Sequence, residues 1–312
     1  MKQKLHVRLA SPRGFCAGVE RAIRTVEEAL AAHGAPVYVR HEIVHNAHVV
    51  SRLKAMGAVF IEDIAEAPTD RPIIFSAHGA PLAAYESVSS RSMVMLDATC
   101  PLVKKVHSQA RRLAARGFHI LLIGHKGHPE VQGTMGQLYP GAMTLIETVE
   151  DAQSFAAPDK PLAYVTQTTL SVDDTAAIIS TLKGRFPDLE GPRTSDICYA
   201  TSNRQAAAKE IGRLSDVVLV IGSPTSSNSC RLVEVALAAG ARDARLVNDP
   251  ASYDLSFLDG VEALGVTAGA SAPESLVETL LTRLAERFAL TIETIETAKE
   301  DVTFKSPMLL AS

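Results

Sequence analysis

ASPRGFCAGVERAI, residues 10–23, is the stretch from which the organisation of the chain can be worked out. Residues 6–10, ahead of Cys16, are predicted to form a strand, and a proline and a glycine then signal a turn. Apolar side chains recur at helical spacing over residues 19–30, and Gly34 is a natural helix stop. Cys16 is therefore expected at the entrance of a helix that follows a strand.

Two more cysteines have the same setting. Cys100 closes the sequence DATC after the apolar run 93–96, and Pro101 suits the first turn of a helix. Cys198 lies in DICYATSNRQ, again at the head of a helical pattern. The dipole and the N–H groups of a helix N-terminus favour a thiolate. Three thiolates at three helix entrances therefore indicate a site for a soft metal centre.

Length and composition limit the class of protein. The 312 residues suggest two or three domains, and 46% hydrophobic with 21% charged residues predict a large buried core. The net charge of −4 argues against general nucleic-acid binding. No apolar run is long enough to span a bilayer, and the first residues lack the apolar segment of a secretion signal. Four widely spaced cysteines do not resemble a disulfide framework, so we expect a cytoplasmic protein with reduced thiols. From the net charge and the lack of a long apolar run, we expect neither a nucleic-acid nor a membrane partner.

Short aliphatic runs alternate with helical patterns along most of the chain. This alternation predicts an α/β fold with mostly parallel sheets, in which ligands gather at the carboxyl ends of strands. Further strands are predicted at residues 37–40, 58–61, 73–76, 93–96, 119–123, 143–146, 163–166, 217–221, 244–247 and 263–267. Further helices are predicted at residues 48–56, 104–116, 173–186, 204–214, 231–239 and 273–287.

Domain boundaries are expected near Pro101 and in the proline-containing segment 187–193. They divide the chain into three small α/β lobes and a tail, namely residues 1–101 with Cys16 and Cys100, residues 102–196, residues 197–287 with Cys198, and the tail 288–312. The tail is expected either to dock on one of the lobes or to fray.

Five loops that follow predicted strands are rich in His, Ser, Thr and Asn, namely residues 76–79, 124–130, 166–171, 222–229 and 267–273. The last two open helices with small residues and hydroxyl groups, which suits them to bind the oxygens of a phosphate or diphosphate. His78 and His128 could add donors. Helix capping explains any one of these loops equally well, but their recurrence favours a ligand.

Glu130 is the only carboxylate in the loop 124–130, where it could pass a proton to a bound substrate. The competing interpretation is an exposed glutamate without a chemical role, which is the more common case for a single residue of this type.

HEIVH, residues 41–45, matches the HExxH motif of zinc proteases. That motif requires one continuous helix, which places both imidazoles on one face. Here a strand is predicted to end at residue 40 and a helix to begin only near residue 46 or 48, so the zinc hypothesis is disfavoured. If it fails, His45 fits a donor to an anion and His41 a structural role.

Cys230 is the fourth cysteine, about one turn into a predicted helix. It could serve as another metal ligand, but a buried structural cysteine is the favoured interpretation.

Nine segments together resemble the family of 4-hydroxy-3-methylbut-2-enyl diphosphate reductases, the iron–sulfur enzymes that complete the methylerythritol phosphate route to isoprenoids. In chain order, between residues 12 and 273, these segments are GFCAGVERAI, YVRHEIVHN, FSAHG, DATCPLVKKVH, IGHKGHPEVQGTMGQ, VTQTTLSVDDT, DICYATSNRQ, GSPTSSNS and GVTAGASAP. The remaining residues at the end of the chain contribute nothing to the resemblance.

The resemblance implies three α/β lobes around a central [4Fe–4S] cluster held by Cys16, Cys100 and Cys198. One iron would lack a protein ligand and could bind the substrate hydroxyl, while the cluster passes electrons one at a time. The implied reaction is reductive removal of the allylic hydroxyl of 4-hydroxy-3-methylbut-2-enyl diphosphate. It gives isopentenyl and dimethylallyl diphosphates and consumes two electrons and two protons.

The resemblance also assigns residues to the substrate. The diphosphate would be held by His45, His78, His128, Ser226, Ser227, Asn228 and Ser271. Glu130 would be the proton source, and Thr168 would lie by the substrate hydroxyl and help to relay the proton. A reduced flavodoxin or ferredoxin would donate the electrons, since no GxGxxG motif for a nicotinamide or flavin cofactor is present.

Two other functions stay open at this point. One is a zinc hydrolase that uses His41, Glu42 and His45, which leaves the three helix-entrance cysteines unexplained. The other is a non-catalytic iron–sulfur sensor, which explains the cysteines but not Glu130 or the anion-binding loops.

Overall fold

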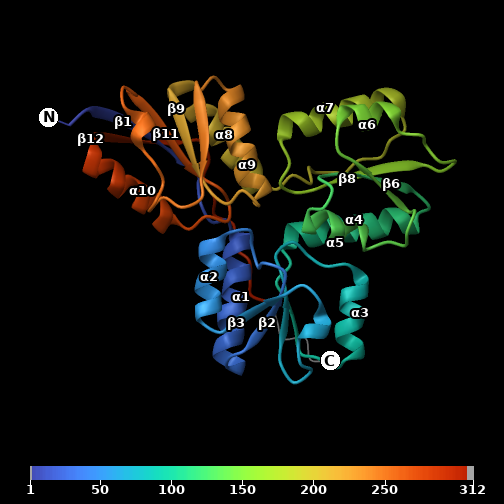
Figure 1. The fold of residues 1–312 in the computed structure, drawn as a ribbon. Helices are drawn as coiled ribbons and strands as arrows, with labels where there is room; N and C mark the ends of the chain where they lie inside the picture. Colours follow the sequence, from blue (N-terminus) through green and yellow to red (C-terminus); the bar gives the residue numbers. More distant parts are fainter. Residues whose placement is uncertain (1, 308–312) are drawn as a thin grey trace. The chain divides into compact units, whose positions relative to one another are not determined.

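The computed structural model describes residues 2–307 and contains three sheets whose strand pairings are all parallel within that range (Figure 1). The predicted fold of three parallel-sheet α/β lobes is therefore confirmed. The chain divides into two compact units. Unit 1 contains one sheet and consists of residues 2–16, 45–47 and 199–302, and unit 2 contains two sheets and consists of residues 17–44, 48–198 and 303–307.

The sheet of unit 1 has five strands. Their spatial order is β10 (Asp243–Val247), β9 (Val217–Ile221), β11 (Ala263–Ala268), β1 (Lys4–Ser11) and β12 (Ala289–Glu296). Its helices are α8 (Tyr199–Leu214), α9 (Ser227–Ala238), α10 (Glu274–Arg287) and the short 3₁₀ helix η2 (Ser256–Leu258).

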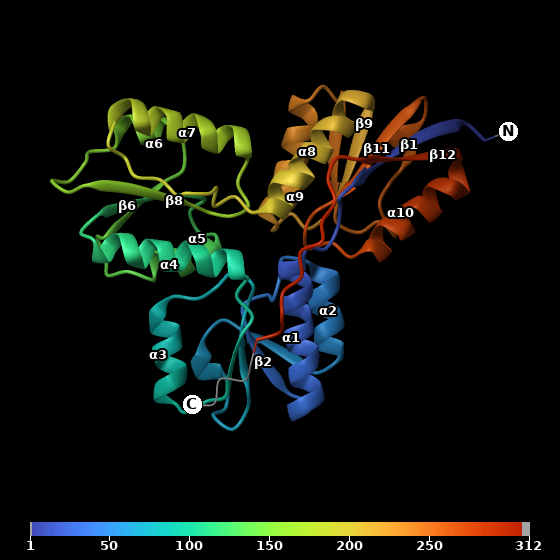
Figure 2. The same ribbon diagram turned by 180° about the vertical axis from the view of Figure 1, so that it is seen from behind.

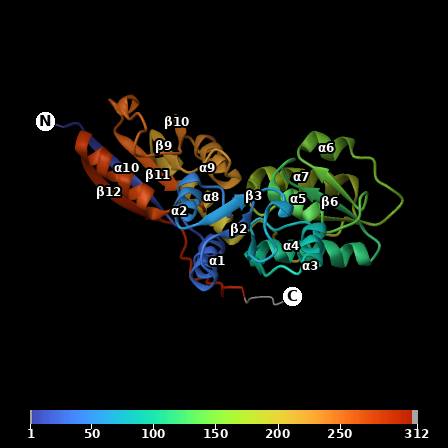
Figure 3. The ribbon, with the colours of Figure 1, turned by 60° about the horizontal axis from the view of Figure 1, so that its bottom comes forward.

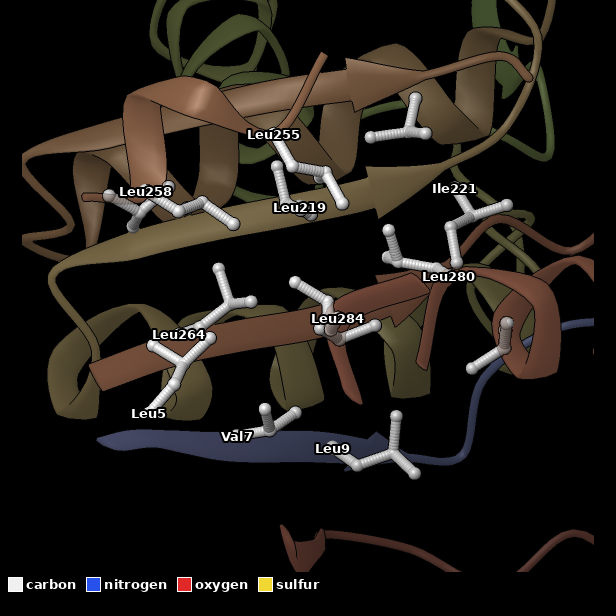
Figure 4. Packing of buried hydrophobic residues seen from close by; sticks show 14 of the residues in the cluster. Leu5, Val7, Leu9, Leu219, Ile221, Leu255, Leu258, Leu264, Leu280 and Leu284 are labelled. Atoms are coloured by element: carbon white, nitrogen blue, oxygen red, sulfur yellow. The ribbon is translucent and has the colours of Figure 1, made fainter. Parts of the chain in front are cut away.

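The two faces of this sheet follow from the period of two along its strands. In β9, Leu219 and Ile221 pack against Leu280 of α10, and in Figure 3 this helix lies along β11 and β12. The close view in Figure 4 shows these leucines together with Leu5 of β1. Val220 belongs to the opposite face, which α8 and α9 cover. Helices on both faces explain why β9 is a continuous aliphatic run, because burial of each such side chain contributes about 1.5–3 kcal/mol.

Strand β1 lies between β11 and β12 in this sheet, although these strands come from opposite ends of the chain. The boundaries given above placed residues 1–101 in one lobe and residues 288–312 in a tail. In the structure residues 4–11 pair with the sheet of residues 217–296, and residues 289–296 form its edge strand. The physical reason is burial, since Leu5, Val7 and Leu9 alternate into the core that α10 closes.

The first sheet of unit 2 has four strands, in the order β3 (Ala58–Ile61), β2 (Val37–Arg40), β4 (Ile73–Phe75) and β5 (Met95–Asp97). The helices of this lobe are α1 (Ala17–His33), α2 (Ala47–Ala55), the 3₁₀ helix η1 (Ile64–Glu66) and α3 (Leu82–Ser90). Val88 of α3 packs with Ile73 and Phe75 over one face of the sheet.

The second sheet of unit 2 has three strands, in the order β7 (Met143–Ile146), β6 (His119–Ile123) and β8 (Leu162–Thr166). One face is covered by α4 (Pro101–Ala115) and α5 (Pro129–Met135), and the other by α6 (Val149–Ser154) and α7 (Val172–Arg185). In β6, Leu122 packs toward α4 and Leu121 toward α7, which again makes the strand apolar throughout.

Residues 303–307 belong to unit 2 and run beside α1 (Figure 2). Arg21 of α1 donates to the carbonyl of Lys305, and the Ser306 hydroxyl donates to Glu28. The tail is thus docked as far as residue 307, and residues 308–312 lie outside the described range.

Three short helices depart from the sequence predictions. Helices α3, α5 and α6 were not predicted, and the loop expected at residues 124–130 ends early because Pro129 begins α5. Each has fewer than three turns, which is too short for a helical period to stand out, although proline in the first turn was a usable signal for α5. The strand expected at 93–96 lies instead at Met95–Asp97. Within residues 2–307 no helix combines the length and the apolar character needed to cross a membrane.

Candidate active site

Cys16 lies at the carboxyl end of the central strands of unit 1. Its backbone N–H donates to the carbonyl of Ala270 at 3.3 Å, and that of Gly14 donates to Ala268 at 3.1 Å. Gly14 has φ of +67°, and a β carbon there would lie 3.2 Å from the carbonyl oxygen of Ala272. A glycine is therefore needed for the turn that brings Cys16 against the loop after β11.

The two predicted anion-binding loops of unit 1 pack directly on each other. The N–H of Gly269 donates to the carbonyl of Ile221 at 2.9 Å. A β carbon on Gly222 or Gly269 would lie 2.2 Å or 2.0 Å from the Ser229 hydroxyl, so both glycines permit close backbone approach. Ser226 is the N-cap of α9 and accepts the N–H of Ser229. The loops 222–229 and 267–273 therefore form one structure at the ends of β9 and β11.

Among residues 2–307, Asn228 has a side-chain amide of which neither polar atom has a hydrogen-bond partner. Its side chain is 4% exposed, and both Oδ1 and Nδ2 are buried. An unpaired buried amide costs free energy, and a polar group bound beside it would remove that cost. Ser227 is half-buried at the first position of α9, and the buried Ser271 donates to the carbonyl of His45 at 3.0 Å.

Two cysteines of unit 2 are joined by backbone hydrogen bonds to other predicted site residues. The N–H of Cys100, the N-cap of α4, donates to the carbonyl of Ala77, the neighbour of His78, at 3.0 Å. The N–H of Cys198 donates to the carbonyl of Thr168 at 3.1 Å. Both cysteines are half-buried and precede a helix, as predicted.

His78 and His128 lie edge to face, with ring centroids 5.8 Å apart. His128 is the N-cap of α5, and its Nδ1 accepts the N–H of Glu130 at 3.2 Å. Because Nδ1 accepts, the neutral ring carries its proton on Nε2, which makes Nε2 a donor suited to an anion.

Glu130 is buried, not exposed as the competing interpretation required. Its carboxylate accepts the Thr168 N–H at 2.6 Å and the Thr168 hydroxyl at 3.0 Å. Burial is the main cause that raises the pKa of Glu130 to about 7; the two bonds from Thr168 oppose it, and the nearby charge of Asp196 adds to it. A carboxyl with a pKa near neutrality can both hold and release a proton under physiological conditions.

The predicted site residues thus form one connected group on each unit. Unit 1 holds Cys16, His45, Ser226, Ser227, Asn228 and Ser271. Unit 2 holds His78, Cys100, His128, Glu130, Thr168 and Cys198.

The HEIVH segment does not have the conformation that a zinc site requires. Strand β2 ends at Arg40, α2 begins at Ala47, and His41 between them has φ of 60°. Its Nδ1 forms an ion pair with Glu62. Among residues 2–307 no group of three or more His, Cys, Asp or Glu side chains is arranged to hold a metal ion by itself.

Cys230 is half-buried, not buried, in the first turn of α9, and its thiol contacts the carbonyl of Pro224 at 3.4 Å. Burial raises the pKa of its thiol, and the charge of Glu234 adds to that effect. A raised pKa disfavours the thiolate form of Cys230 in the protein without a metal.

Asp196 was missed in the sequence. Its side chain is buried, and its Oδ2 accepts the N–H of Thr166 at 3.3 Å. Burial raises its pKa, which the charge of Lys105 opposes. The sequence signal that could have identified Asp196 is its position two residues before Cys198. A carboxylate is unexpected there, because the thiolate of a metal-binding cysteine would repel it.

Comparisons with known proteins agree along the whole chain. Residues 7–285 match the family model described as LytB protein. A protein of Hyphomonas neptunium named 4-hydroxy-3-methylbut-2-enyl diphosphate reductase is 58% identical over 311 residues, which cover 99% of both chains. A protein of the same name from Phenylobacterium zucineum is 60% identical over 308 residues and 98% of both chains.

Solved structures give the same result. The E-1-hydroxy-2-methyl-but-2-enyl-4-diphosphate reductase of Plasmodium falciparum is 39% identical, with a TM-score of 0.93 over 98% of this chain and 96% of that one. A second structure, of a reductase described as the terminal enzyme of the non-mevalonate pathway, is 30% identical with a TM-score of 0.65 over 90% of this chain and 99% of that one.

Proposed function

This chain belongs to the LytB family of 4-hydroxy-3-methylbut-2-enyl diphosphate reductases, and we propose from this premise which of its residues bind the cofactor and carry out the reaction. The chain is an oxidoreductase of the non-mevalonate isoprenoid pathway, in which it catalyses the terminal step. The zinc-hydrolase and sensor hypotheses are therefore set aside.

Cys16, Cys100 and Cys198 are the ligands of one [4Fe–4S] cluster in this proposal. Their chemistry fits the cofactor, because none of the four cysteines forms a disulfide and these three each precede a helix, where a thiolate is favoured. The bound cluster would supply single electrons and one iron, free of protein ligands, as a Lewis acid. Cys230 stands outside the ligand set in this proposal, because it lies within the first turn of α9 and not ahead of a helix.

The diphosphate of the substrate is bound by seven polar side chains in this proposal. The unpaired amide of Asn228 and the hydroxyl groups of Ser226, Ser227 and Ser271 are the donors on unit 1, together with His45. His78 and His128 are the donors on unit 2, where the Nδ1 contact of His128 leaves Nε2 as the donor.

The observation that carries the mechanism is the buried pair of Glu130 and Thr168. Removal of the allylic hydroxyl as water requires a proton, and a pKa of about 7 lets Glu130 hold one at neutral pH. The Thr168 hydroxyl lies 3.0 Å from the carboxyl and can pass the proton on. The Thr168 carbonyl also accepts the N–H of Cys198. Thr168 therefore hydrogen-bonds both to Glu130, the proposed proton source, and to Cys198, a proposed cluster ligand.

The two electrons come from a reduced flavodoxin or ferredoxin in this proposal, because the sequence holds no motif for a nicotinamide or flavin. Such redox partners make small, transient contacts. Four cysteines without a disulfide also fit the reducing cytoplasm, which is the expected compartment.

Anaerobic purification of wild type, Cys16→Ser and Cys230→Ser tests the ligand assignment. About four irons and four sulfides per chain are expected in wild type and in Cys230→Ser, and Cys16→Ser should lose them. Zinc without sulfide in wild type, or an unchanged cluster in Cys16→Ser, would refute the assignment.

Glu130→Gln tests the proton role. The variant should keep its iron and sulfide and lose most of its turnover of the allylic diphosphate. Turnover equal to wild type would refute the role of Glu130, whereas loss of both cluster and turnover would show that Glu130 acts on the fold.

A further inference from the structure

Three cations occupy equivalent places after the three cysteines. Arg21, Lys105 and Arg204 each lie in the second turn of the helix that follows Cys16, Cys100 or Cys198. Nothing in the resemblance or in the proposed mechanism uses them. The hydrogen bonds of each cation nevertheless end on the loop that precedes a different cysteine.

Arg21 of α1 holds the loop before Cys100. Its side chain is 6% exposed, and it donates to the carbonyl of Thr99 at 3.1 Å and to that of Asp97 at 3.3 Å. Its Nε donates to the carbonyl of Lys305 in the tail. The two residues whose carbonyls it binds lie one and three positions before the cysteine.

Lys105 of α4 holds the loop before Cys198. Its Nζ lies 3.2 Å and 3.0 Å from the carbonyl and hydroxyl oxygens of Thr194 and 3.0 Å from the carbonyl of Ser195. It also lies 3.3 Å from a carboxylate oxygen of Asp196, whose side chain is fully buried. One ammonium group therefore binds three consecutive residues of the segment that ends at the cysteine.

Arg204 of α8 holds the loop before Cys16. Its side chain is 1% exposed, its Nε donates to the carbonyl of Gly14 at 3.0 Å, and another nitrogen donates to that of Phe15 at 3.2 Å. Glu300 compensates the buried charge through bonds of 2.9–3.2 Å to both terminal nitrogens.

The three sets of contacts form a closed cycle in the sequence. The helix after Cys16 binds the loop before Cys100, the helix after Cys100 binds the loop before Cys198, and the helix after Cys198 binds the loop before Cys16. A structural cation would have no reason to choose the residues just before a cysteine in all three cases. A cluster does give a reason, because its three thiolates must keep fixed positions and carry negative charge.

We propose that Arg21, Lys105 and Arg204 are positioning residues for the iron–sulfur cluster, which they serve by fixing the backbone before each cysteine. This inference rests on the proposed function, since it presupposes that the three cysteines hold one cluster. Outer residues that orient metal ligands typically change metal affinity about 10–100-fold when they are replaced.

Lys105 is the best position for a test, because its side chain is partly exposed whereas both arginines are buried. The variants are Lys105→Met, Lys105→Arg and, as a control, Arg112→Met, which removes an exposed cation from the same helix α4. The measurements are the melting temperature of each apoprotein, the rate at which a chelator removes iron from each reconstituted holoprotein, and the reduction potential of the cluster.

Lys105→Met should lower the melting temperature of the apoprotein, because the buried Asp196 carboxylate loses its cation. At a temperature where its apoprotein is still folded, the variant should release iron about tenfold faster or more and have a lower reduction potential. Lys105→Arg should restore both properties, and Arg112→Met should match wild type. Iron release and potential equal to wild type in Lys105→Met would overturn the proposal. Wild type that binds no cluster would instead refute the proposed function.

If the apoprotein of Lys105→Met unfolds at the assay temperature, Thr194→Val replaces it in the test. This change removes one acceptor of Lys105 at an exposed position. Faster iron release from this variant supports the proposal, and unchanged release overturns it.

Discussion

Replacement of Thr168 by valine should move the pH dependence of the reaction upward. Valine keeps the shape of this 4%-exposed side chain and removes the hydroxyl that donates to the Glu130 carboxylate at 3.0 Å. That bond stabilises the charged form of Glu130, so its loss raises the pKa. The backbone N–H of Thr168, at 2.6 Å, remains as a donor in the variant.

The size of the effect follows from the energy of the bond. A hydrogen bond to a charged group contributes about 1.5–3 kcal/mol, and a pKa change of one corresponds to about 1.4 kcal/mol, so the pKa should rise by about one to two. In the proposed mechanism Glu130 donates its proton, so turnover should fall as the pH rises through the Glu130 pKa of about 7 in wild type. In the variant the fall should come at about pH 8–9.

The assay is the pH profile of turnover, together with a spectroscopic titration of the Glu130 carboxyl in the cluster-free protein. The titration reports the pKa of Glu130 directly. A loss of proton relay, in contrast, would lower the maximal turnover in the pH profile without changing the pH at which turnover falls. A midpoint that stays at about 7, or moves to lower pH, would refute the conclusion that the Thr168 hydroxyl stabilises the carboxylate.

Glu130→Gln should also change how stability depends on pH. The wild-type carboxyl has a folded-state pKa of about 7, against its ordinary value of 4.5. The stability that the protonated carboxyl contributes is therefore complete below about pH 4.5 and is lost as the pH rises through 7. The melting temperature of the variant should therefore gain on wild type between pH 5 and pH 8, and a difference independent of pH would contradict the buried carboxyl. Gly222→Ala should destabilise the fold by about 1–3 kcal/mol, because the added carbon would lie 2.2 Å from the Ser229 hydroxyl, whereas Gly184→Ala meets no atom within 4 Å and serves as its control in thermal melts. His41→Ala should leave the iron, sulfide and zinc content unchanged, and metal loss in this variant would revive the zinc hypothesis.

The layered fold was predictable because each aliphatic run is bounded by turn residues. The strands at Val37–Arg40, His119–Ile123 and Val217–Ile221 have the predicted limits. Which sheet a strand joins was not predictable, because that depends on the core it completes. Residues 4–11 would fit any of the three sheets by periodicity, and only their packing against α10 selects one.

The candidate site was predictable in its residue types and less so in its environment. Cysteines at helix entrances are visible in the sequence, but the burial that moves the pKa of Glu130 is a property of the packed structure. Thr168 could be selected from its neighbouring threonines only by the resemblance. Arg204 left a signal that was not used, since it shares a helical face with Ala207, Ala208 and Ile211 and so places a charge on an apolar stripe.

The position of β1 in the middle of its sheet has a consequence for biosynthesis. Both neighbours of β1, the strands β11 and β12, leave the ribosome after all four cysteines have been translated. The hydrogen bonds that seat Cys16 end on Ala268 and Ala270, and Glu300, which neutralises Arg204, emerges later still. The first cysteine to be made therefore reaches its native hydrogen bonds only after all four cysteines have been translated. With Cys16 as a cluster ligand, as proposed above, iron–sulfur assembly would have to act on a nearly complete chain, and until then the nascent thiol would need protection from oxidants.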